Sequence, residues 1–244
     1  HVPLGDKSID IPVVYPDTSA VMAFFPIAIA KAHEYIKTKR FKPVSILGGK
    51  SLAGITVFDY RDSPVGPYRE MALSIPVTLD SIISIPFLPL FFDSFFNTFG
   101  FYTILLAMNT DIAREHSERI FGYPTFSRNI EINITSGNTH ITAETEENGE
   151  KILSLRIKNS THVKTEKKKY ITYIVKNDII TSVEMRAAAF AGHSRGKNCA
   201  ELTLGDHEIA LILKSLSIDP YALQSSYYSD AIEILGVPQN RGSA

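Results

Sequence analysis

Two short stretches of this sequence combine charged side chains with a setting in which they could do chemistry. Arg69 and Glu70 are adjacent in an apolar, strand-like run, and Glu118 and Arg119 precede the sequence Gly-Tyr-Pro-Thr-Phe at residues 122–126. A carboxylate on a strand could position a polar ligand group, and an arginine could bind an anion. The simpler explanation is structural: a surface ion pair for Arg69 and Glu70, and a salt bridge from Arg119 to a nearby glutamate.

The other candidate groups lack the surroundings that their chemistry needs. Gly-Gly-Lys at 48–50 lacks the spacing of a phosphate-binding loop, so we expect a hairpin with Lys50 exposed. His193 and Ser194 stand in a glycine-flanked stretch that predicts a flexible loop, without the strand-turn-helix context of a nucleophile elbow. His207 follows Asp206 at a predicted helix start, where capping and packing explain both residues. No spacing matches a metal site, and we expect no cofactor.

The composition is that of a soluble globular protein. Of 244 residues, 44% are hydrophobic and 21% are charged, which suffices for a substantial core. A net charge of -1 gives no overall field toward nucleic acid or an anionic membrane. The single cysteine, Cys199, excludes an internal disulfide framework, and residues 1–10 do not form a signal peptide, so a cytoplasmic location is expected. Without a linker or repeat, residues 1–244 are expected to form one domain.

Strands must position most of these groups. Apolar alternation and turn signals predict strands over 9–15, 44–60 (as two short strands), 68–77, 101–112, 130–134, 140–146, 151–158, 169–176, 179–190, 199–204 and 222–235. Helices are predicted over 19–25, 27–37, 114–119 and 208–216, the last capped by Asp206. The charged run 165–169 is expected to be a solvated loop. Many strands and few helices predict an antiparallel barrel-like or sandwich core with peripheral helices.

One apolar segment, residues 79–99, is rich in Phe, Ile and Leu but is interrupted by prolines and charged residues. These interruptions make it a poor transmembrane helix. A buried lid or a subunit contact is the preferred interpretation. The wall of a lipophilic ligand pocket ranks second, and contact with a membrane surface ranks third.

Three blocks, taken in order along the chain, resemble the acetoacetate decarboxylase superfamily. They are Gly-Pro-Tyr-Arg-Glu at 66–70, Glu-Arg-Ile-Phe-Gly-Tyr-Pro at 118–124 and Leu-Gly-Asp-His-Glu-Ile-Ala at 204–210. The resemblance implies a β-rich α+β fold: a closed, cone-like antiparallel β-barrel with flanking helices and a shielded interior cavity. It also implies a tendency to form homo-oligomers. Under this resemblance Glu70 points into the barrel and Arg69 outward, since neighbouring strand residues face opposite ways.

The same comparison also shows that residues needed for the family's usual chemistry are missing from this sequence. In that family a lysine after the Tyr/Phe-Pro pair forms a Schiff base with a ketone, and acetoacetate decarboxylase is itself a standard example of a lysine activated by its surroundings. Here Thr125 and Phe126 follow Tyr123 and Pro124, and threonine cannot form an iminium. The family's entrance arginine is missing near residues 8–9. A family glutamate is replaced by Ile55, and only Glu70 is retained.

The sequence therefore predicts a barrel without its Schiff-base lysine that binds a small keto acid or a lipophilic carboxylate. The alternative is a diverged lyase-type enzyme that acts on a keto acid or related carbonyl compound without Schiff-base formation. No nucleic-acid partner is expected. The expected ligand contacts are Tyr68, Glu70, Arg119, Tyr123, Thr125 and Phe126.

Overall fold

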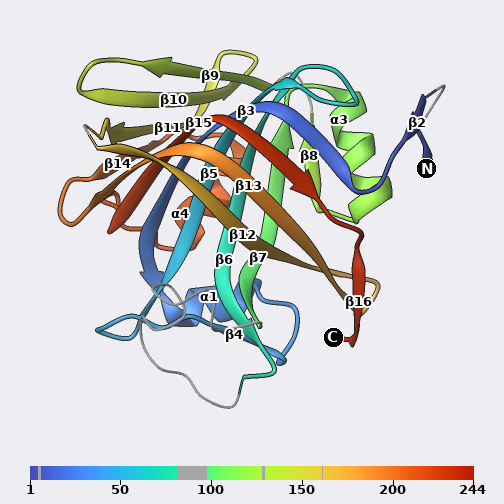
Figure 1. Ribbon diagram of the computed structural model, residues 1–244. Helices are drawn as coiled ribbons and strands as arrows, with labels where there is room; N and C mark the ends of the chain where they lie inside the picture. Colours follow the sequence, from blue (N-terminus) through green and yellow to red (C-terminus); the bar gives the residue numbers. More distant parts are fainter. Residues whose placement is uncertain (5–6, 82–97, 128–129, 161) are drawn as a thin grey trace.

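A closed barrel of seven strands forms the centre of the computed structural model, which describes residues 1–4, 7–81, 98–127, 130–160 and 162–244 (Figure 1). Neighbouring strands are antiparallel, except that β7 and β12 meet in a short parallel contact. The ring closes because β7 also pairs with β6, which leaves no free edge. In spatial order the barrel strands are β6 (Tyr68–Leu79), β5 (Lys50–Asp62), β3 (Val13–Ala28), β15 (Gln224–Leu235), β13 (Ile179–Arg195), β12 (Val163–Lys176) and β7 (Phe99–Met108).

Gly100 makes the parallel contact between β7 and β12 possible. A Cβ atom at this position would lie 2.5 Å from the carbonyl oxygen of Ile171 and 2.6 Å from the ring of Tyr173. Real Cβ atoms do not approach other atoms so closely, so only glycine fits where these two strands meet. The contact is short: Thr172 lies opposite Phe101 and Tyr173 opposite Tyr102.

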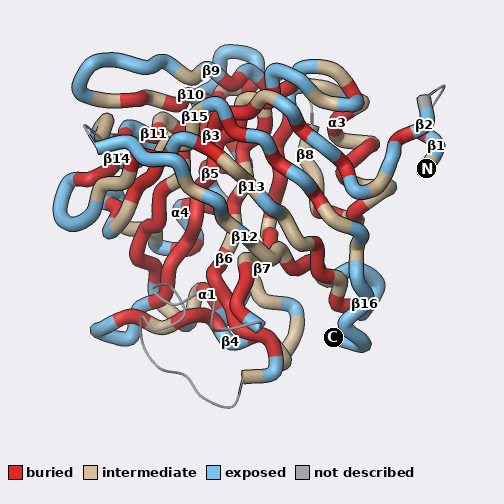
Figure 2. Tube along the Cα trace, viewed as in Figure 1, coloured by how far each residue is buried: buried red, intermediate tan, exposed pale blue. Residues whose placement is uncertain are grey.

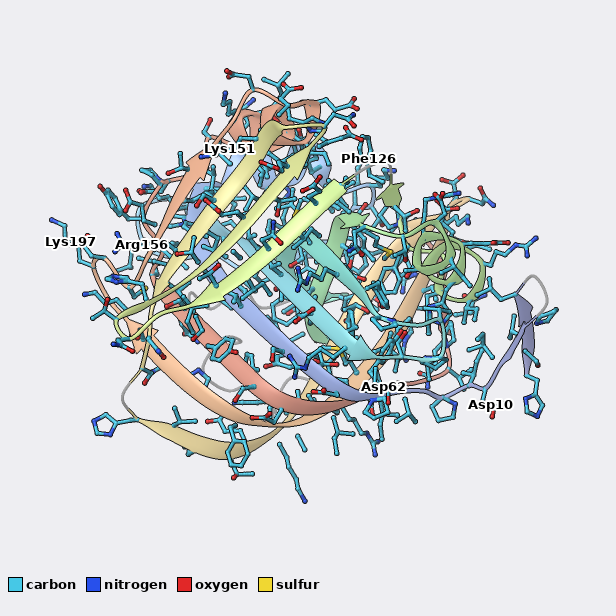
Figure 3. All side chains as sticks on the ribbon, turned by 90° about the horizontal axis from the view of Figure 1, so that it is seen from above. Asp10, Asp62, Phe126, Lys151, Arg156 and Lys197 are labelled. Atoms are coloured by element: carbon cyan, nitrogen blue, oxygen red, sulfur yellow. The ribbon has the colours of Figure 1, made fainter. Side chains whose placement is uncertain are left out.

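A second, antiparallel sheet covers one outer face of the barrel (Figures 1 and 3). Because strand residues alternate between faces, odd-numbered residues of β5, β6 and the part of β3 from residue 21 onward pack under this sheet, while even-numbered ones face the barrel interior. These strands are therefore buried along most of their length (Figure 2). In spatial order the second sheet contains β14 (Ala200–Leu204), β11 (Glu150–Lys158), β10 (His140–Glu147) and β9 (Ile130–Ser136), and α4 (Glu208–Ser215) packs on β11 and β14.

Short elements complete the fold. Helix α1 (Ile29–Tyr35) lies at one end of the barrel, and α3 (Asp111–His116) continues into a π-helical turn (Ser117–Phe121) at the other (Figure 1). Gly122, with φ at 80°, ends that turn in the left-handed conformation that favours glycine. The remaining strands are β1 (Val2–Leu4), β2 (Lys7–Ile9), β4 (Phe41–Pro43), β8 (Thr125–Ser127) and β16 (Gln239–Ser243).

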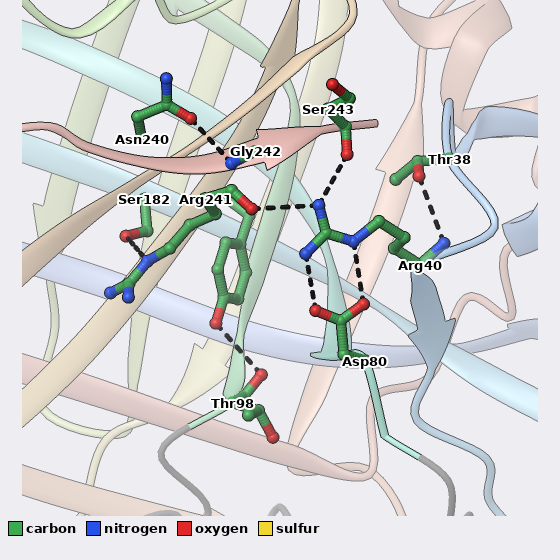
Figure 4. A network of polar contacts seen from close by, with 10 residues as sticks. Thr38, Arg40, Asp80, Thr98, Ser182, Asn240, Arg241, Gly242 and Ser243 are labelled. Atoms are coloured by element: carbon green, nitrogen blue, oxygen red, sulfur yellow. Dashed lines mark hydrogen bonds and ion pairs between the residues drawn. The ribbon is translucent and has the colours of Figure 1, made fainter.

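A polar network centred on Arg40, the residue before β4, holds β16 to the barrel (Figure 4). The Arg40 guanidinium binds both carboxylate oxygens of Asp80, at 2.9 and 2.6 Å, and donates to the carbonyl oxygens of Arg241 and Ser243. The Tyr173 hydroxyl donates to the carbonyl oxygen of Thr98 at 3.2 Å. Asp80 and Thr98 are thereby fixed on the two sides of residues 82–97, which lie outside the described part of the chain. The interpretations of segment 79–99 fall largely on those residues.

Several sequence predictions were wrong. Residues 19–25, predicted as a helix, belong to β3, because their apolar side chains alternate between two buried environments. Residues 165–169, predicted as a loop, belong to β12, and the stretch around His193 forms the end of β13. The predicted strand pair over 44–60 is instead mainly the long strand β5. Lysines dominate 165–169 because the outer face of β12 is exposed.

Other predictions were confirmed. The strand at 68–77, the helix within 27–37, the helical turn at 114–119 and the helix at 208–216 all form, with shifted ends.

The cap of α4 is His207 rather than Asp206: its Nδ1 accepts a hydrogen bond from the Ile209 backbone N–H at 3.2 Å. Among the described residues, no helix has the length and apolar character needed to span a lipid bilayer.

Candidate functional site

The barrel interior contains two neighbouring chambers that share walls. The outer chamber has a volume of about 570 Å³ and the inner one about 90 Å³. Residues Met22, Phe24, Phe101 and Tyr170 line both, so the chambers follow one another along the barrel. An apolar cavity with a few convergent polar groups is the usual form of a ligand site.

The inner chamber is built around a buried carboxyl group. Glu70, on β6, is almost fully buried, and burial followed by repulsion from Glu233 raises its pKa to about 8. Glu233, on β15 opposite Tyr15, is also buried, and burial raises its pKa to about 8. One of its carboxyl oxygens has no hydrogen-bond partner among the described residues. Near neutral pH both groups therefore hold a proton and can donate it in a hydrogen bond.

Closely packed tyrosines, together with several serines and threonines, form the rest of the polar lining of the inner chamber. The ring centroids of Tyr15 and Tyr60 are 4.7 Å apart, and those of Tyr60 and Tyr68 are 4.6 Å apart. Burial raises the pKa of each of these phenols, so each keeps its proton and remains a donor. Tyr123 hydrogen-bonds the hydroxyl of Thr172. The chamber thus offers neutral O–H groups to a ligand, and no lysine or arginine is among its described lining residues.

The outer chamber has the opposite character. Its walls include Phe24, Phe99 and Phe101, which pack ring against ring. Its polar lining is mostly cationic, in contrast to that of the inner chamber. The charged and titratable residues that line it are Lys164, Glu166, Lys168, Lys169, His193 and Arg195.

Three of the sequence-predicted site residues meet at the inner chamber. Tyr68, Glu70 and Tyr123 all line it, although their roles in ligand binding stay a prediction. The predicted outward direction of Arg69 is confirmed, since its guanidinium binds Asp59 at 2.8 Å and donates to the backbone on β9. Lys50 is half exposed and lies 3.8 Å from Asp219, as expected for a turn lysine.

The other three predicted contacts do not line either chamber. Arg119 is exposed and pairs with Glu115 at 2.8 Å, the salt bridge that the sequence offered as its alternative, because the π-helical turn directs it to solvent. Phe126 (labelled in Figure 3) packs against the hydrophobic cluster that contains the second sheet, and its ring lies perpendicular to that of His207. Thr125 lies opposite the chamber residue Leu106, but its hydroxyl donates to Glu118.

The third sequence block, at 204–210, has a structural role. His207 caps α4 through Nδ1 and binds the buried carboxylate of Glu147 through Nε2 at 2.6 Å. The predicted explanation of His207 by capping and packing is confirmed. Within the described residues, no group of His, Cys, Asp and Glu side chains could hold a metal ion.

Sequence reasoning missed the chamber residue Thr56 and the buried Glu233, whose charge acts on Glu70. Glu233 stands between Ile232 and Ile234, which suggests an exposed charge on a buried strand, yet Ile232 is 52% exposed and Glu233 only 3%. Ile55, the position compared with a family glutamate, packs under the second sheet, whereas its neighbour Thr56 faces the inner chamber. Only the strand register, which alternation alone leaves ambiguous, could have found these positions.

Comparison with known proteins identifies a matching family and solved structures with a similar fold. The family model for acetoacetate decarboxylase matches residues 2–230. A solved acetoacetate decarboxylase from Legionella pneumophila aligns with a TM-score of 0.65 at 11% identity, covering 95% of this chain and 88% of that one. The enduracididine biosynthesis enzyme MppR, complexed with pyruvate, aligns with a TM-score of 0.63 at 9% identity, covering 97% of this chain and 93% of that one.

An acetoacetate decarboxylase-like enzyme from Sphingomonas wittichii RW1 aligns with a TM-score of 0.60 at 12% identity, covering 97% of this chain and 95% of that one. At these identities the alignments show a shared fold. Comparison with curated protein sequences gives no match. Because the family model spans nearly the whole sequence, this chain belongs to the acetoacetate decarboxylase family.

Proposed function

We propose that this protein binds a lipophilic carboxylate inside its barrel. The observation that carries the proposal is the outer chamber, where about 570 Å³ of space with aromatic walls adjoins a cluster of cationic side chains. Apolar walls favour a hydrocarbon body, and Lys168 and Arg195 offer charge-assisted hydrogen bonds to a carboxylate. The ligand would place its head at these cations and its body along Phe24 and Phe101.

The inner chamber supports a further feature of the ligand. Protonated Glu70 and the tyrosines donate hydrogen bonds, and among the described lining residues there is no cation to balance a second negative charge. A ketone or hydroxyl oxygen fits these donors better than a carboxylate does. A small keto acid, the other ligand class expected from the sequence, would leave most of the outer chamber empty.

We also propose that the protein does not work through a Schiff base. Thr125 follows the Tyr123-Pro124 pair, and its hydroxyl donates to Glu118. Acetoacetate with borohydride should leave the protein mass unchanged, whereas a covalent adduct on any lysine would contradict this proposal. Lys168 is the position to inspect first, because it is a partly buried amine in the outer chamber.

A second candidate function is catalysis without a Schiff base, and the buried acids favour it. Glu70 and Glu233 have pKa values near neutrality, the range in which a carboxyl group can act as general acid or base. Turnover of a keto acid that is lost in Glu70→Gln would support this candidate. Absence of turnover across a panel of keto acids would reject it.

Binding can be tested with matched ligands and matched variants. Isothermal titration with decanoate and with methyl decanoate separates the contribution of the charged head from that of the chain. Lys168→Met should weaken decanoate binding about 10-fold, the effect of losing one hydrogen bond to a charged group, and should leave methyl decanoate unaffected. Lys197→Met is the matched control, because Lys197 is exposed and projects away from the barrel (Figure 3).

A homo-oligomer is also proposed, from exposed apolar residues on the outside of the barrel. Val14, Ile232 and Ile234 are all more than one-third exposed, and Val14 pairs with Ile234 across β3 and β15. Such a patch suits contact with a second copy. Light scattering on the wild type and on Ile232→Lys would test the proposal. A wild-type monomer at high protein concentration would contradict it.

A further inference from the structure

Three side chains of the outer chamber form a connected polar chain that neither proposed function uses. Nδ1 of His193 lies 2.8 Å from the hydroxyl of Ser226, and its Nε2 lies 3.1 Å from a carboxylate oxygen of Glu166. All three residues line the chamber. They come from three strands, β15, β13 and β12, so distant parts of the sequence build the arrangement.

The strands hold the serine and the histidine in fixed positions. His193 on β13 lies directly opposite Ser226 on β15, and Ser226 lies opposite Met22 on β3. Residues directly opposite one another point to the same face of a sheet, here the chamber side. Ser226 is buried against the strands, and the His193 side chain is 26% exposed. Sites carried on strands are held more precisely than sites on loops.

The arrangement satisfies what a serine nucleophile requires. A nearby base must accept the hydroxyl proton, and a third group must fix the tautomer of that base. Burial opposes ionisation of Glu166, but hydrogen bonds from Lys164 and His193 lower its pKa, so the group is a carboxylate. With its proton on Nε2, which lies 3.1 Å from the carboxylate, His193 keeps the lone pair of Nδ1 for the Ser226 hydroxyl. The two ring nitrogens are exchanged relative to serine proteases, and each can carry the proton.

We propose that Ser226, His193 and Glu166 hydrolyse carboxylic esters of lipophilic acids. The Ser226 oxygen forms a bond to the ester carbonyl carbon while its proton moves to Nδ1 of His193. The carbon–oxygen bond to the alcohol then breaks, and the alcohol leaves with that proton. Water, deprotonated by His193, then attacks the carbonyl carbon of the acyl-serine. The bond from that carbon to the Ser226 oxygen breaks, His193 returns the proton to Ser226, and the carboxylic acid is released. Only the choice of acyl group rests on the proposed carboxylate binding.

Neighbouring donors could stabilise the negative oxygen that forms during the reaction. The hydroxyls of Tyr170 and Tyr228 lie 2.9 Å apart, and both residues line the chamber. The Tyr228 ring meets the edge of His193 with centroids 5.9 Å apart. Burial, followed by the neighbouring Tyr228, raises the pKa of Tyr170, so its phenol keeps a proton to donate. Lys168 adds a positive charge on the same wall.

The decisive experiment combines active-site labelling with an ester assay on the full chain. A fluorophosphonate with a decyl chain should modify Ser226, as located by peptide mass spectrometry. The wild type should hydrolyse p-nitrophenyl decanoate, and Ser226→Ala and His193→Ala should each lower kcat by about 100-fold or more. Hydrolysis that persists in Ser226→Ala, no hydrolysis by the wild type, or no labelling of Ser226 would overturn the proposal.

Ser225→Ala is the matched control. The Ser225 hydroxyl donates to the Cys199 carbonyl oxygen at 3.0 Å, on the other side of β15, and the residue does not line the chamber. This variant should keep the wild-type rate. Decanoate titration of the wild type and of Ser226→Ala separates the two proposals. Retained binding with lost hydrolysis in Ser226→Ala supports both, whereas a wild type that hydrolyses the ester but does not bind decanoate would reject carboxylate binding alone.

Glu166 is a positioning residue, and its test needs a readout that loss of structure would not imitate. The groups that surround His193 are Lys164, Glu166 and Lys168 on β12, Arg195 on β13 and Tyr228 on β15. Glu166→Gln removes the negative charge that lies beside the imidazolium and stabilises it. The acidic limb of the kcat/KM profile should therefore move to lower pH. An unchanged profile would exclude Glu166 from the proposed set.

Discussion

The two chambers of the barrel share walls but present different chemistry to a ligand. The inner chamber is small and lined by neutral donors, with protonated Glu70 among closely packed tyrosines and the protonated Glu233 nearby. The outer chamber is several times larger, with aromatic walls and cationic side chains. A ligand that fills both would need a carboxylate at one end and an uncharged oxygen at the other.

The difference follows from how each chamber is covered. At the inner chamber, α3 and the π-helical turn pack over the barrel, with Phe121 and Tyr123 buried below them. At the outer chamber, β12 pairs with β7 only at Thr172 and Tyr173. The first half of β12 is therefore partly exposed, so its lysine side chains can line the chamber and still reach water. Burial of the inner lining favours neutral groups, whereas the partial exposure of β12 permits charges.

The largest expected effect concerns Glu147, a third buried glutamate, which serves as a reference for the two in and near the inner chamber. It is paired with His207, whereas neither Glu70 nor Glu233 forms an ion pair in the described part of the chain. His207→Ala removes the cap of α4 and leaves Glu147 buried without its partner, which should lower the free energy of unfolding by about 3–5 kcal/mol. Urea denaturation would measure it. In Glu147→Gln/His207→Ala the loss should be less than additive; full additivity would contradict the pairing.

The pH dependence of stability tests the neutral state of the inner chamber. Glu70 and Glu233 have pKa values of about 8 in the folded protein against an ordinary value of 4.5. Between these values the unfolded chain binds fewer protons than the folded one, so stability is full below about pH 4.5 and declines as pH rises through 8. Thermal melts should show Glu233→Gln to be more stable than the wild type at about pH 9 and similar at about pH 5.

The exposed Asp230, on the same strand as Glu233, provides the control for that experiment. Asp230→Asn should follow the wild-type stability at both pH values, because an exposed carboxylate is solvated in the folded and unfolded states alike. If Glu233→Gln were no more stable than the wild type in alkaline solution, the two glutamates would not be protonated in the folded protein.

A smaller effect on binding affinity should show that the two chambers recognise different parts of the ligand. Tyr68→Phe removes one donor from the inner chamber and should weaken binding of an oxo-fatty acid about 5-fold, the contribution of one hydrogen bond, without changing binding of the unsubstituted fatty acid. Competition titrations with the two acids would measure the ratio. Equal weakening of both ligands would mean that the inner chamber does not recognise the oxo group.

The sequence predicted the fold better than it predicted the site. The three motif blocks indicated the barrel, and alternation placed Glu70 inside it and Arg69 outside it. The helix predicted over 19–25 is a strand, because a strand buried on both faces loses the alternation that marks strands. For Arg119 the sequence left a ligand contact and a salt bridge open, and the π-helical turn gives the salt bridge; Phe126 was misplaced because a three-residue strand sets its direction. Glu233 and His193 depend on register across strands far apart in sequence.

A crystal structure with terminally brominated decanoate tests the central claim most directly, because the bromine locates the chain end by its anomalous signal. We expect the carboxylate within hydrogen-bond distance of Lys168 or Arg195, and the bromine beyond Phe24 and Phe101 toward Glu70. The reverse orientation, with the carboxylate beside Glu70, or a bromine site outside the barrel would contradict the account.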